Sequence, residues 1–352
     1  MTTRSLLLLA GTTLLAILLA WGLHREHRPD PPGEFLLPGL ASQLDELSAL
    51  ELHAAGAEAF RIERSADGWR APAKGGYPVD AGKVRRFVLR LAQARVVATK
   101  TSRPELHDRL GVADVDADAG AGIVVRLEGA GELPGIVVGQ REARGLQGTH
   151  VRREGEDTAL LVDQELQPDR EATQWLQRDL LDIAADELQS LRIVHPDGEE
   201  LAVSRDDLGI FVLEDLPEDR TLAGPTGPEA LARALTGLRM DDVRPADGWA
   251  PEGTPTKAEF RLRNGMVVEA RSWAADEETW VAFAARVEMT GNEASTGAGT
   301  AGDDEVQESE PPAEETAAVL NQRLGPWLFR LPAWKQEVLL RRVEDLLQPV
   351  AH

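Results

Sequence analysis

The sequence of 352 residues contains no cysteine and only one tyrosine. The absence of cysteine excludes disulfides, iron–sulfur clusters, thiolate zinc sites and cysteine nucleophiles. Basic residues are also scarce, because 38 Lys and Arg stand against 60 Asp and Glu, which gives a net charge of -22. This balance argues against nucleic-acid binding, since phosphate backbones attract clustered Lys and Arg. Hydrophobic residues make up 42% of the chain, which is enough to build a packed core.

The sequence signatures of common enzyme classes are missing too. There is no G-x-S-x-G, no phosphate-binding loop and no H-E-x-x-H. Gly297, Gly299 and Gly302 satisfy G-x-G-x-x-G, but they lie in an acidic stretch without the strand and helix that a dinucleotide site needs. The seven His have no catalytic spacing to a Ser or a carboxylate. We predict no catalytic residue, no cofactor and no metal site.

One metal site stays open as an alternative. Asp114, Asp116 and Asp118 alternate like the start of a calcium loop. An EF-hand loop would carry Gly and Glu where Ala119 and Val125 stand, so a solvated acidic loop is the preferred interpretation.

The N-terminal region contains one long apolar run. Residues 5–23 carry no charge and include nine Leu. As a helix they would span roughly 28 Å, close to the hydrocarbon thickness of a membrane. A cleaved signal peptide would place Leu18 at the −3 position before Ala20, which is unfavourable. We therefore predict a short flank at 1–4, a transmembrane anchor at 5–23 and a linker at 24–34. An N-terminal anchor of this kind usually exports the domains C-terminal to it, so we expect the remainder of the chain in the periplasm.

An internal repeat organises the rest of the chain. Residues 44–69 match residues 185–210 at a constant offset of 141, for example Leu50 with Leu191 and Gly68 with Gly209. The alternation of apolar residues predicts a strand hairpin in each copy, with turns at Gly56 and Gly198. Each copy contains the sequence Trp-Leu-x-Arg, which we take to close the module.

Helices are predicted from apolar residues that recur on one face. In the first copy, Val84, Phe87, Val88 and Leu91 follow Asp80, a good N-cap. In the second copy, the corresponding residues are Thr226, Pro228, Leu231, Leu235 and Leu238. A further amphipathic helix is predicted from Trp334 to Leu347.

These elements predict an α+β fold class. We expect two tandem modules, at 35–183 and 184–348, each with a mostly antiparallel sheet and one main helix. Residues 291–318 contain eight Asp or Glu and no Lys or Arg, so we predict a disordered acidic loop there. The acidity is uneven, since residues 184–290 carry 22 acidic and 11 basic side chains.

Five residues are candidates for an interface or a structural role. Tyr77 follows the conspicuous turn Gly75-Gly76, which predicts either a connecting turn or a ligand-binding loop. The two Trp-Leu-x-Arg sequences supply the others, for which core packing with a stacked Arg is the preferred interpretation and an interface anchor the alternative. These residues are Trp175, Arg178, Trp327 and Arg330.

An ordered set of motifs resembles a known family. The motifs are Gly-Gly-Tyr-Pro-Val-Asp at 75–80, Arg-Leu-Gly-Val at 109–112, the run 175–183, and Trp327 with Leu331-Pro332 and Trp334-Lys335. Together they resemble bacterial membrane-anchored proteins that carry the domain of unknown function 4340. The resemblance implies an envelope protein of the bacterial inner membrane without an assigned activity, and a partner of ABC-type transport systems with gliding-motility-like auxiliary subunits.

We therefore expect a non-enzymatic accessory or scaffold subunit of an ABC-type complex, attached to the membrane and in contact with a permease or auxiliary subunit. Two alternatives stay open. An envelope hydrolase would use paired carboxylates, one of them with a raised pKa. A ligand-binding sensor would need a preformed concave pocket.

Overall fold

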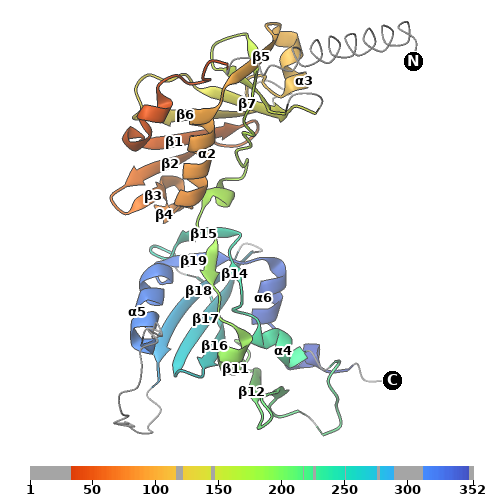
Figure 1. The fold of residues 1–352 in the computed structure, drawn as a ribbon. Coiled ribbons are helices and arrows are strands. Elements are labelled where there is room, and N and C mark those ends of the chain that lie inside the picture. Colours follow the sequence, from red (N-terminus) through yellow and green to blue (C-terminus); the bar gives the residue numbers. More distant parts are fainter. Residues whose placement is uncertain are drawn as a thin grey trace, which may run out of the picture. The chain divides into compact units, whose positions relative to one another are not determined.

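The chain forms two compact units. The computed structural model describes residues 33–115, 122–143, 147–216, 218–224, 227–249, 251–275, 278–288 and 312–348. Unit 1 comprises residues 1–64 and 81–170, and unit 2 comprises residues 65–80 and 171–352. Residues 65–80 and 171–183, which the repeat predicts in the first module, therefore belong to unit 2. The sheets of the described residues are mostly antiparallel and their helices are few, so the fold is α+β as predicted (Figure 1).

In unit 1, seven strands lie in the order β2-β1-β6-β7-β8-β9-β5. Their bounds are β1 (Ala49–Ala54), β2 (Phe60–Ser65), β5 (Val96–Thr101), β6 (Ile123–Glu128), β7 (Ile136–Arg141), β8 (Thr149–Arg153) and β9 (Ala159–Val162). The predicted first hairpin is confirmed, because β1 pairs with β2 and Gly56 adopts φ 75° in the turn. Positive φ is the reason that glycine stands there.

The main helix of unit 1 is α2 (Ala81–Gln93). It buries Val84, Phe87, Val88 and Leu91, which confirms the predicted apolar face. Short helical turns complete this unit. They are η1 (Leu40–Ser42), η2 (Leu44–Glu46), η4 (Pro104–Leu106) and α3 (His107–Leu110).

In unit 2, eight strands lie in the order β13-β12-β11-β16-β17-β18-β19-β15. Their bounds are β11 (Leu188–Val194), β12 (Glu200–Arg205), β13 (Phe211–Leu213), β15 (Asp242–Pro245), β16 (Thr256–Leu262), β17 (Met266–Ala275), β18 (Glu278–Val287) and β19 (Trp327–Arg330). The second predicted hairpin is confirmed too, with β11 paired to β12 and Gly198 at φ 88°.

Two smaller strand pairs accompany this sheet. The first consists of β3 (Gly68–Ala71) and β4 (Tyr77–Pro78), joined by η3 (Pro72–Lys74). The second consists of β10 (Asp179–Leu181) and β14 (Leu238–Arg239). The helices and helical turns of this unit are α4 (Gly227–Ala232), α5 (Ala313–Leu324), α6 (Ala333–Leu339), η5 (Ala172–Trp175), η6 (Ala185–Glu187) and η7 (Val343–Leu346).

The structure corrects two predicted helices. The predicted helix from Trp334 to Leu347 ends at Leu339, where α6 stops. It stops because tertiary contacts fix the chain beyond it: Arg342 pairs with Asp197 and Glu199, and an extended Arg342 caps η7. In the second copy, the predicted helix is the six-residue α4, and Leu238 belongs to β14 instead.

Part of the predicted acidic loop is helical. Residues 313–318, which composition assigned to that loop, form the first half of α5. Residues 291–311 of the loop lie outside the described residues, as do the predicted anchor at 5–23, the flank at 1–4 and residues 24–32 of the linker. Within the described ranges, no helix is long and apolar enough to span a membrane.

Candidate functional site

Tyr77 is the centre of an aromatic cluster in unit 2. Its ring meets Trp327 edge to face at 4.9 Å between centroids, and Phe329 at 6.2 Å. Its hydroxyl donates to the carbonyl of Gln177 at 3.1 Å. Burial raises the pKa of Tyr77 to about 12, against the opposing charge of Arg323. The phenol therefore stays protonated and fixes β4, which is a structural role.

The turn before Tyr77 is also held tightly within unit 2. Gly75 has φ 67°, and a Cβ atom there would clash with Cγ of Pro245. The Lys74 ammonium pairs with the Asp242 carboxylate at 2.5 Å. Glycine at 75 is thus required both by its backbone conformation and by the close approach of the neighbouring chain.

The four other predicted residues do not form one site. Trp175 is buried in η5, and its carbonyl accepts the Asp80 amide at 2.9 Å. Arg178 donates to the carbonyl of Met240 at 2.8 Å and pairs with Asp241 at 3.0 Å. Arg330 lies in β19 and pairs with Glu278. Each of these residues holds neighbouring chain segments together.

The two Trp-Leu-x-Arg sequences do not occupy equivalent places. The first begins at the end of η5 and continues toward β10. The second is the strand β19, which pairs with β18 and β15. The prediction that they close the two copies in the same way is therefore wrong, because one is a turn and the other a sheet strand.

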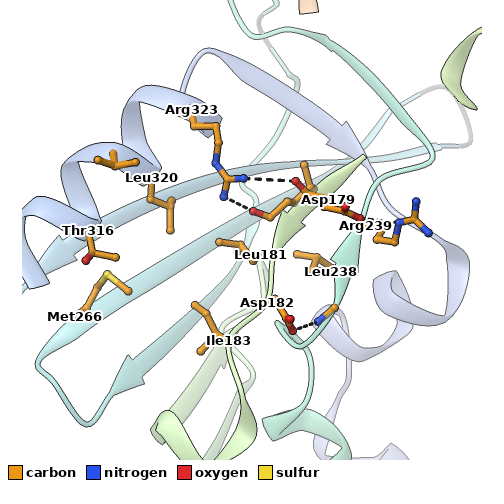
Figure 2. A pocket seen from close by; sticks show the side chains of 13 residues that line it. Asp179, Leu181, Asp182, Ile183, Leu238, Arg239, Met266, Thr316, Leu320 and Arg323 are labelled. Carbon is orange, nitrogen blue, oxygen red and sulfur yellow. Dashed lines mark hydrogen bonds and ion pairs between the residues drawn. The ribbon is translucent and has the colours of Figure 1, made fainter. Parts of the chain in front are cut away.

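Unit 2 contains an apolar pocket of about 590 Å³ (Figure 2). A volume of this size is within the range of small-molecule sites. Helix α5 contributes four residues to the wall of the pocket. They are Thr316, Val319, Leu320 and Arg323. The rest of the lining is Asp179, Leu180, Leu181, Asp182, Ile183, Gly237, Leu238, Arg239 and Met266.

The charged groups around this pocket already have partners in the protein. Arg323 donates to the carbonyls of Leu180 and Asp179. Asp182 accepts the Gly237 amide at 2.8 Å, and Arg239 pairs with Asp179 at 2.9 Å. A ligand in this pocket would therefore meet mainly Leu, Ile, Val and Met side chains.

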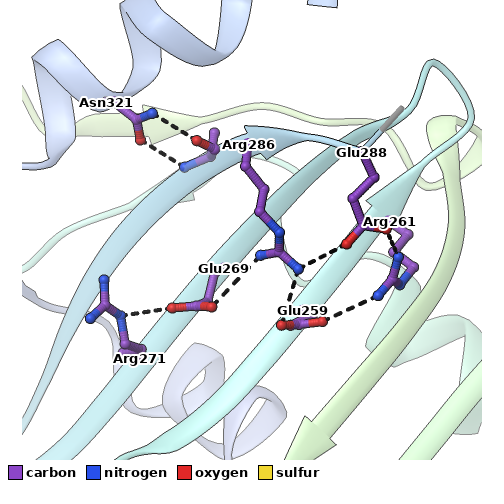
Figure 3. Close-up of polar contacts among 8 residues, drawn as sticks. Glu259, Arg261, Glu269, Arg271, Arg286, Glu288 and Asn321 are labelled. Carbon is purple, nitrogen blue, oxygen red and sulfur yellow. Dashed lines mark hydrogen bonds and ion pairs between the residues drawn. The ribbon is translucent and has the colours of Figure 1, made fainter. Parts of the chain in front are cut away.

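One side of the large sheet in unit 2 carries a network of ion pairs (Figure 3). Arg286 of β18 is its centre, with Glu288 at 3.0 Å, Glu259 at 3.2 Å and Glu269 at 3.7 Å. Arg261 and Arg271 extend it along β16 and β17. Three Arg balance three Glu, so this surface presents little net charge to a partner.

The sheet of unit 1 carries a similar network. Arg126 of β6 pairs with Glu51 at 2.5 Å and with Glu154 at 2.7 Å. Arg61 of β2 pairs with Glu128 at 2.5 Å. The Arg126 hydrogen bonds lower the pKa of Glu154, and the Arg61 hydrogen bonds lower the pKa of Glu128, each against the effect of burial.

Helix α5 closes the open side of β18 in unit 2. Strand β19 pairs with β18 only through Trp280 and Val281. Farther along β18, Asn321 accepts the Ala285 amide and donates to the Ala285 carbonyl, each at 2.7 Å (Figure 3). The side chain thus replaces a strand partner at this residue.

Four of the eight exposed large hydrophobic residues in the described part of the chain lie in and just after the β12–β13 hairpin. We call Leu208, Ile210, Val212 and Leu216 the hairpin patch. Leu208 is 82% exposed and Ile210 50% exposed, and the other two exceed one third. Adjacent exposed apolar side chains of this kind mark interaction sites on soluble domains.

No group of three or more His, Asp or Glu in the described part of the chain is arranged to hold a metal ion. Asp114, from the predicted calcium loop, pairs with Arg152 at 2.5 Å. Asp116, Asp118 and the glycine motif at 297–302 lie outside the described residues.

Sequence reasoning missed both the pocket and the hairpin patch. The pocket is assembled from four separate segments, which no local pattern reveals. The patch does have a sequence signal: apolar residues at 208, 210 and 212 alternate with the apolar 211 and 213, so both faces of the strand are apolar. A strand with only one buried face would alternate with polar residues instead.

Fold and surface together define an α+β protein of antiparallel sheets, with an apolar pocket and an exposed sheet-edge hairpin. The chain belongs to the family described as Domain of unknown function (DUF4340), whose model matches residues 69–264. This match confirms the family resemblance of the sequence motifs and includes the hairpin patch. Comparison with curated proteins gives no match, and comparison with solved structures gives none.

Proposed function

We propose that this chain is a non-enzymatic, single-span envelope protein that acts as an accessory or scaffold subunit of an ABC-type transport complex. The apolar run at 5–23 anchors it in the bacterial inner membrane, with the folded part in the periplasm. Its role is to bind and position a permease or an auxiliary subunit.

The observation that carries this proposal is the hairpin patch. Its four apolar side chains are exposed on one hairpin, and transferring them out of water would favour association. The ion-pair networks on the sheet surfaces offer no comparable apolar area.

The strand order supports a second part of the proposal, that the two units are copies of one module. The seven strands β2-β1-β6-β7-β8-β9-β5 correspond one to one with β12-β11-β16-β17-β18-β19-β15. A duplicated module gives a second copy that is free to take on partner binding, since fold does not prescribe function.

Three carboxyls of the described residues do not fit the general acid of a paired-carboxylate hydrolase. A carboxyl that acts as a general acid has a raised pKa. The pKa values of Glu128, Glu154 and Asp197 all lie below those of ordinary carboxyls. Hydrogen bonds from Arg61 and Arg126 lower the pKa of Glu128 and Glu154, respectively. The backbone hydrogen bond from Glu199, and after it the side-chain hydrogen bond from Arg342, lower the pKa of Asp197.

The proposal is tested by purifying the full-length tagged chain in mild detergent and identifying a permease subunit by mass spectrometry. We expect the double variant Leu208→Ser/Ile210→Ser to lose the permease, because it removes two of the most exposed apolar side chains. Val97→Ser is the matched control, since Val97 is an exposed apolar residue of unit 1. A wild-type chain that purifies alone would overturn the proposal.

A second candidate function, a ligand-binding sensor, is favoured by the pocket beside α5. Its test is native mass spectrometry of the full chain. A bound apolar small molecule that disappears in Leu320→Trp, which would fill the pocket, supports this function; an empty wild-type protein contradicts it.

A further inference from the structure

Strand β13 is an edge strand with an outward-facing row of backbone groups. Among the described residues, it has β12 on one side and no strand on the other. The Glu214 amide bonds to Ala202, and the Ile210 carbonyl accepts the Asp206 amide. Backbone groups alternate in direction along a strand. The amides and carbonyls of Phe211 and Leu213 therefore point toward the open edge.

The hairpin holds this edge in a fixed place. Arg205 donates to the carbonyls of Leu188, Gly209 and Ala185 at 2.7, 2.6 and 2.6 Å. Its guanidinium also lies 4.2 Å from the ring centre of Phe211. Asp206 accepts the amides at the turn, from Leu208 and Ile210. A partner strand would meet a preformed edge and would not have to order it.

The protein covers a similar edge elsewhere with its own chain. The repeat aligns Gly68 of β3 with Gly209, at the start of the β13 segment. Strand β3 is paired by β4, with Arg70 opposite Pro78 and Ala71 opposite Tyr77. After β13 the chain instead turns at Asp215, at φ 54°, and supplies no such strand among the described residues.

The charges around β13 define the chemistry of the missing strand. Segment 206–219 contains six Asp and Glu and no Lys or Arg. All six acidic residues are exposed. They are Asp206, Asp207, Glu214, Asp215, Glu218 and Asp219. A second copy of this edge would bring like charges together, which is unfavourable, whereas a basic segment would be attracted.

We propose that the partner adds an extended segment to the outer edge of β13, and that this segment has apolar residues at its centre and Lys or Arg at both ends, opposite the acids that flank residues 208–213. Its backbone pairs with Phe211 and Leu213, its apolar side chains lie on Val212 and Ile210, and its basic side chains meet the acidic rim. This mode is β-strand addition, in which main-chain hydrogen bonds give affinity and side chains give specificity. The inference rests on the proposed docking role and names its partner chemistry.

The test uses the full-length chain in nanodiscs of zwitterionic lipid, titrated with a short labelled peptide that has Val residues at its centre and Lys residues at both ends. The comparison peptide replaces every Lys with Glu. We expect the Lys peptide to bind at least about tenfold more tightly, and a Pro at its centre to abolish binding. Hydrogen exchange of the fragment containing Phe211 and Leu213 should slow when the Lys peptide is bound.

Charge-reversal variants locate the binding. Asp207→Lys/Glu214→Lys should weaken the Lys peptide about tenfold, and salt should weaken the wild-type complex. Asp247→Lys/Glu252→Lys is the matched control, because both residues are exposed acids outside the hairpin. Circular dichroism checks that all variants fold. Equal binding of the Lys and Glu peptides, or equal binding by both double variants, overturns the inference.

The two proposals fail in different ways. If the hairpin-patch variants lose the permease but no peptide binds, docking stands and strand addition is wrong. If the Lys peptide binds and protects β13 but no permease is captured, strand addition stands and the transport-complex proposal is wrong.

Discussion

The predicted repeat aligns β3 with β13, but among the described residues only β3 has its outer edge covered by a further strand. The chain returns after η3 to pair β4 with β3, and buries Tyr77 in doing so. After β13 the chain leaves the strand edge exposed, with apolar side chains on it and acidic residues around it. Edge strands are normally blocked to prevent association. The edge of β13 is open although the protein covers the edge of β3, and this difference points to a role for the open edge.

The helices α2 of unit 1 and α4 of unit 2, which the sequence repeat predicts to correspond, also differ. Helix α2 has 13 residues and buries five of them. Helix α4 has six residues and ends at Ala232, and a turn follows it. Lys335, which is 2% exposed, donates to the carbonyls of Arg233, Ala234 and Thr236 at 3.0, 2.7 and 2.8 Å. The turn after α4 in unit 2 thus depends on the side chain of Lys335, which is about 100 residues away in the sequence, whereas α2 in unit 1 is a helix of full length.

The largest expected effect comes from uncovering the β3 edge. Tyr77→Ala removes a buried ring that packs on Trp327 and Phe329. We expect it to lower the free energy of unfolding by about 4 kcal/mol, as for other buried aromatic truncations. Denaturant unfolding followed by tryptophan fluorescence measures the loss. Hydrogen exchange at β3 should accelerate toward that of β13.

Tyr77→Phe separates the ring from the hydroxyl. It keeps the packing and loses only the hydrogen bond to Gln177, so we expect a cost of about 1 kcal/mol. If Tyr77→Ala and Tyr77→Phe lower the free energy of unfolding equally, contacts other than the ring hold β4 in place. The buried ring would then not explain why the edge of β3 is covered and that of β13 is open.

Local patterns predicted the parts of the fold that local forces determine. The hairpins at Gly56 and Gly198 and the buried face of α2 are confirmed, because alternation, turn glycines and helical periodicity act within a few residues. The continuous helix from Trp334 failed at Leu339, because the His195 contact to the Arg341 carbonyl and the Arg342 ion pairs are tertiary.

The candidate sites were less accessible to sequence reasoning. Tyr77 and Trp327 were singled out separately, and only the fold brings their rings to 4.9 Å. The pocket draws its wall from β10, β14, β17 and α5. Helix α5 itself begins within the stretch that composition assigned to disorder, since its apolar residues Ala317, Leu320 and Leu324 become visible only as a buried helical face.

An effect smaller than that of Tyr77→Ala is expected when the Lys335 hydrogen bonds to the turn after α4 are removed. Lys335→Met keeps most of the side-chain volume but leaves three carbonyls without their donor. Burial lowers the pKa of Lys335, opposed by the charge of Asp182, so part of the loss is offset by relief of desolvation. We expect unfolding free energy to fall by about 3 kcal/mol. Exposed Lys257 is the matched control, and Lys257→Met should change it by less than about 0.5 kcal/mol. No difference between the two variants would mean that the turn after α4 does not need this donor.

The smallest effect concerns the ion pairs that cover the sheet of unit 1. Hydrogen bonds from Arg126 lower the pKa of Glu154 below its ordinary value of 4.5. The folded state therefore holds this proton more weakly than the unfolded state. The resulting stability is present above the ordinary pKa and is lost as pH falls through the folded pKa. Glu154→Gln should cost less than about 1 kcal/mol at neutral pH, because the pair is partly exposed.

The pH dependence distinguishes charge from packing in this variant. Urea unfolding at neutral pH and at about pH 3 should show the difference between wild type and Glu154→Gln shrinking in acid, as the Glu154 carboxyl takes up its proton. Added salt at neutral pH should shrink it as well. Glu58→Gln, at an exposed carboxyl in the β1–β2 turn, is the control for removing one negative charge. A difference that stays constant across pH would show that Glu154 contributes through packing. The ion pair between Arg126 and Glu154 would then have no part in the stability of unit 1.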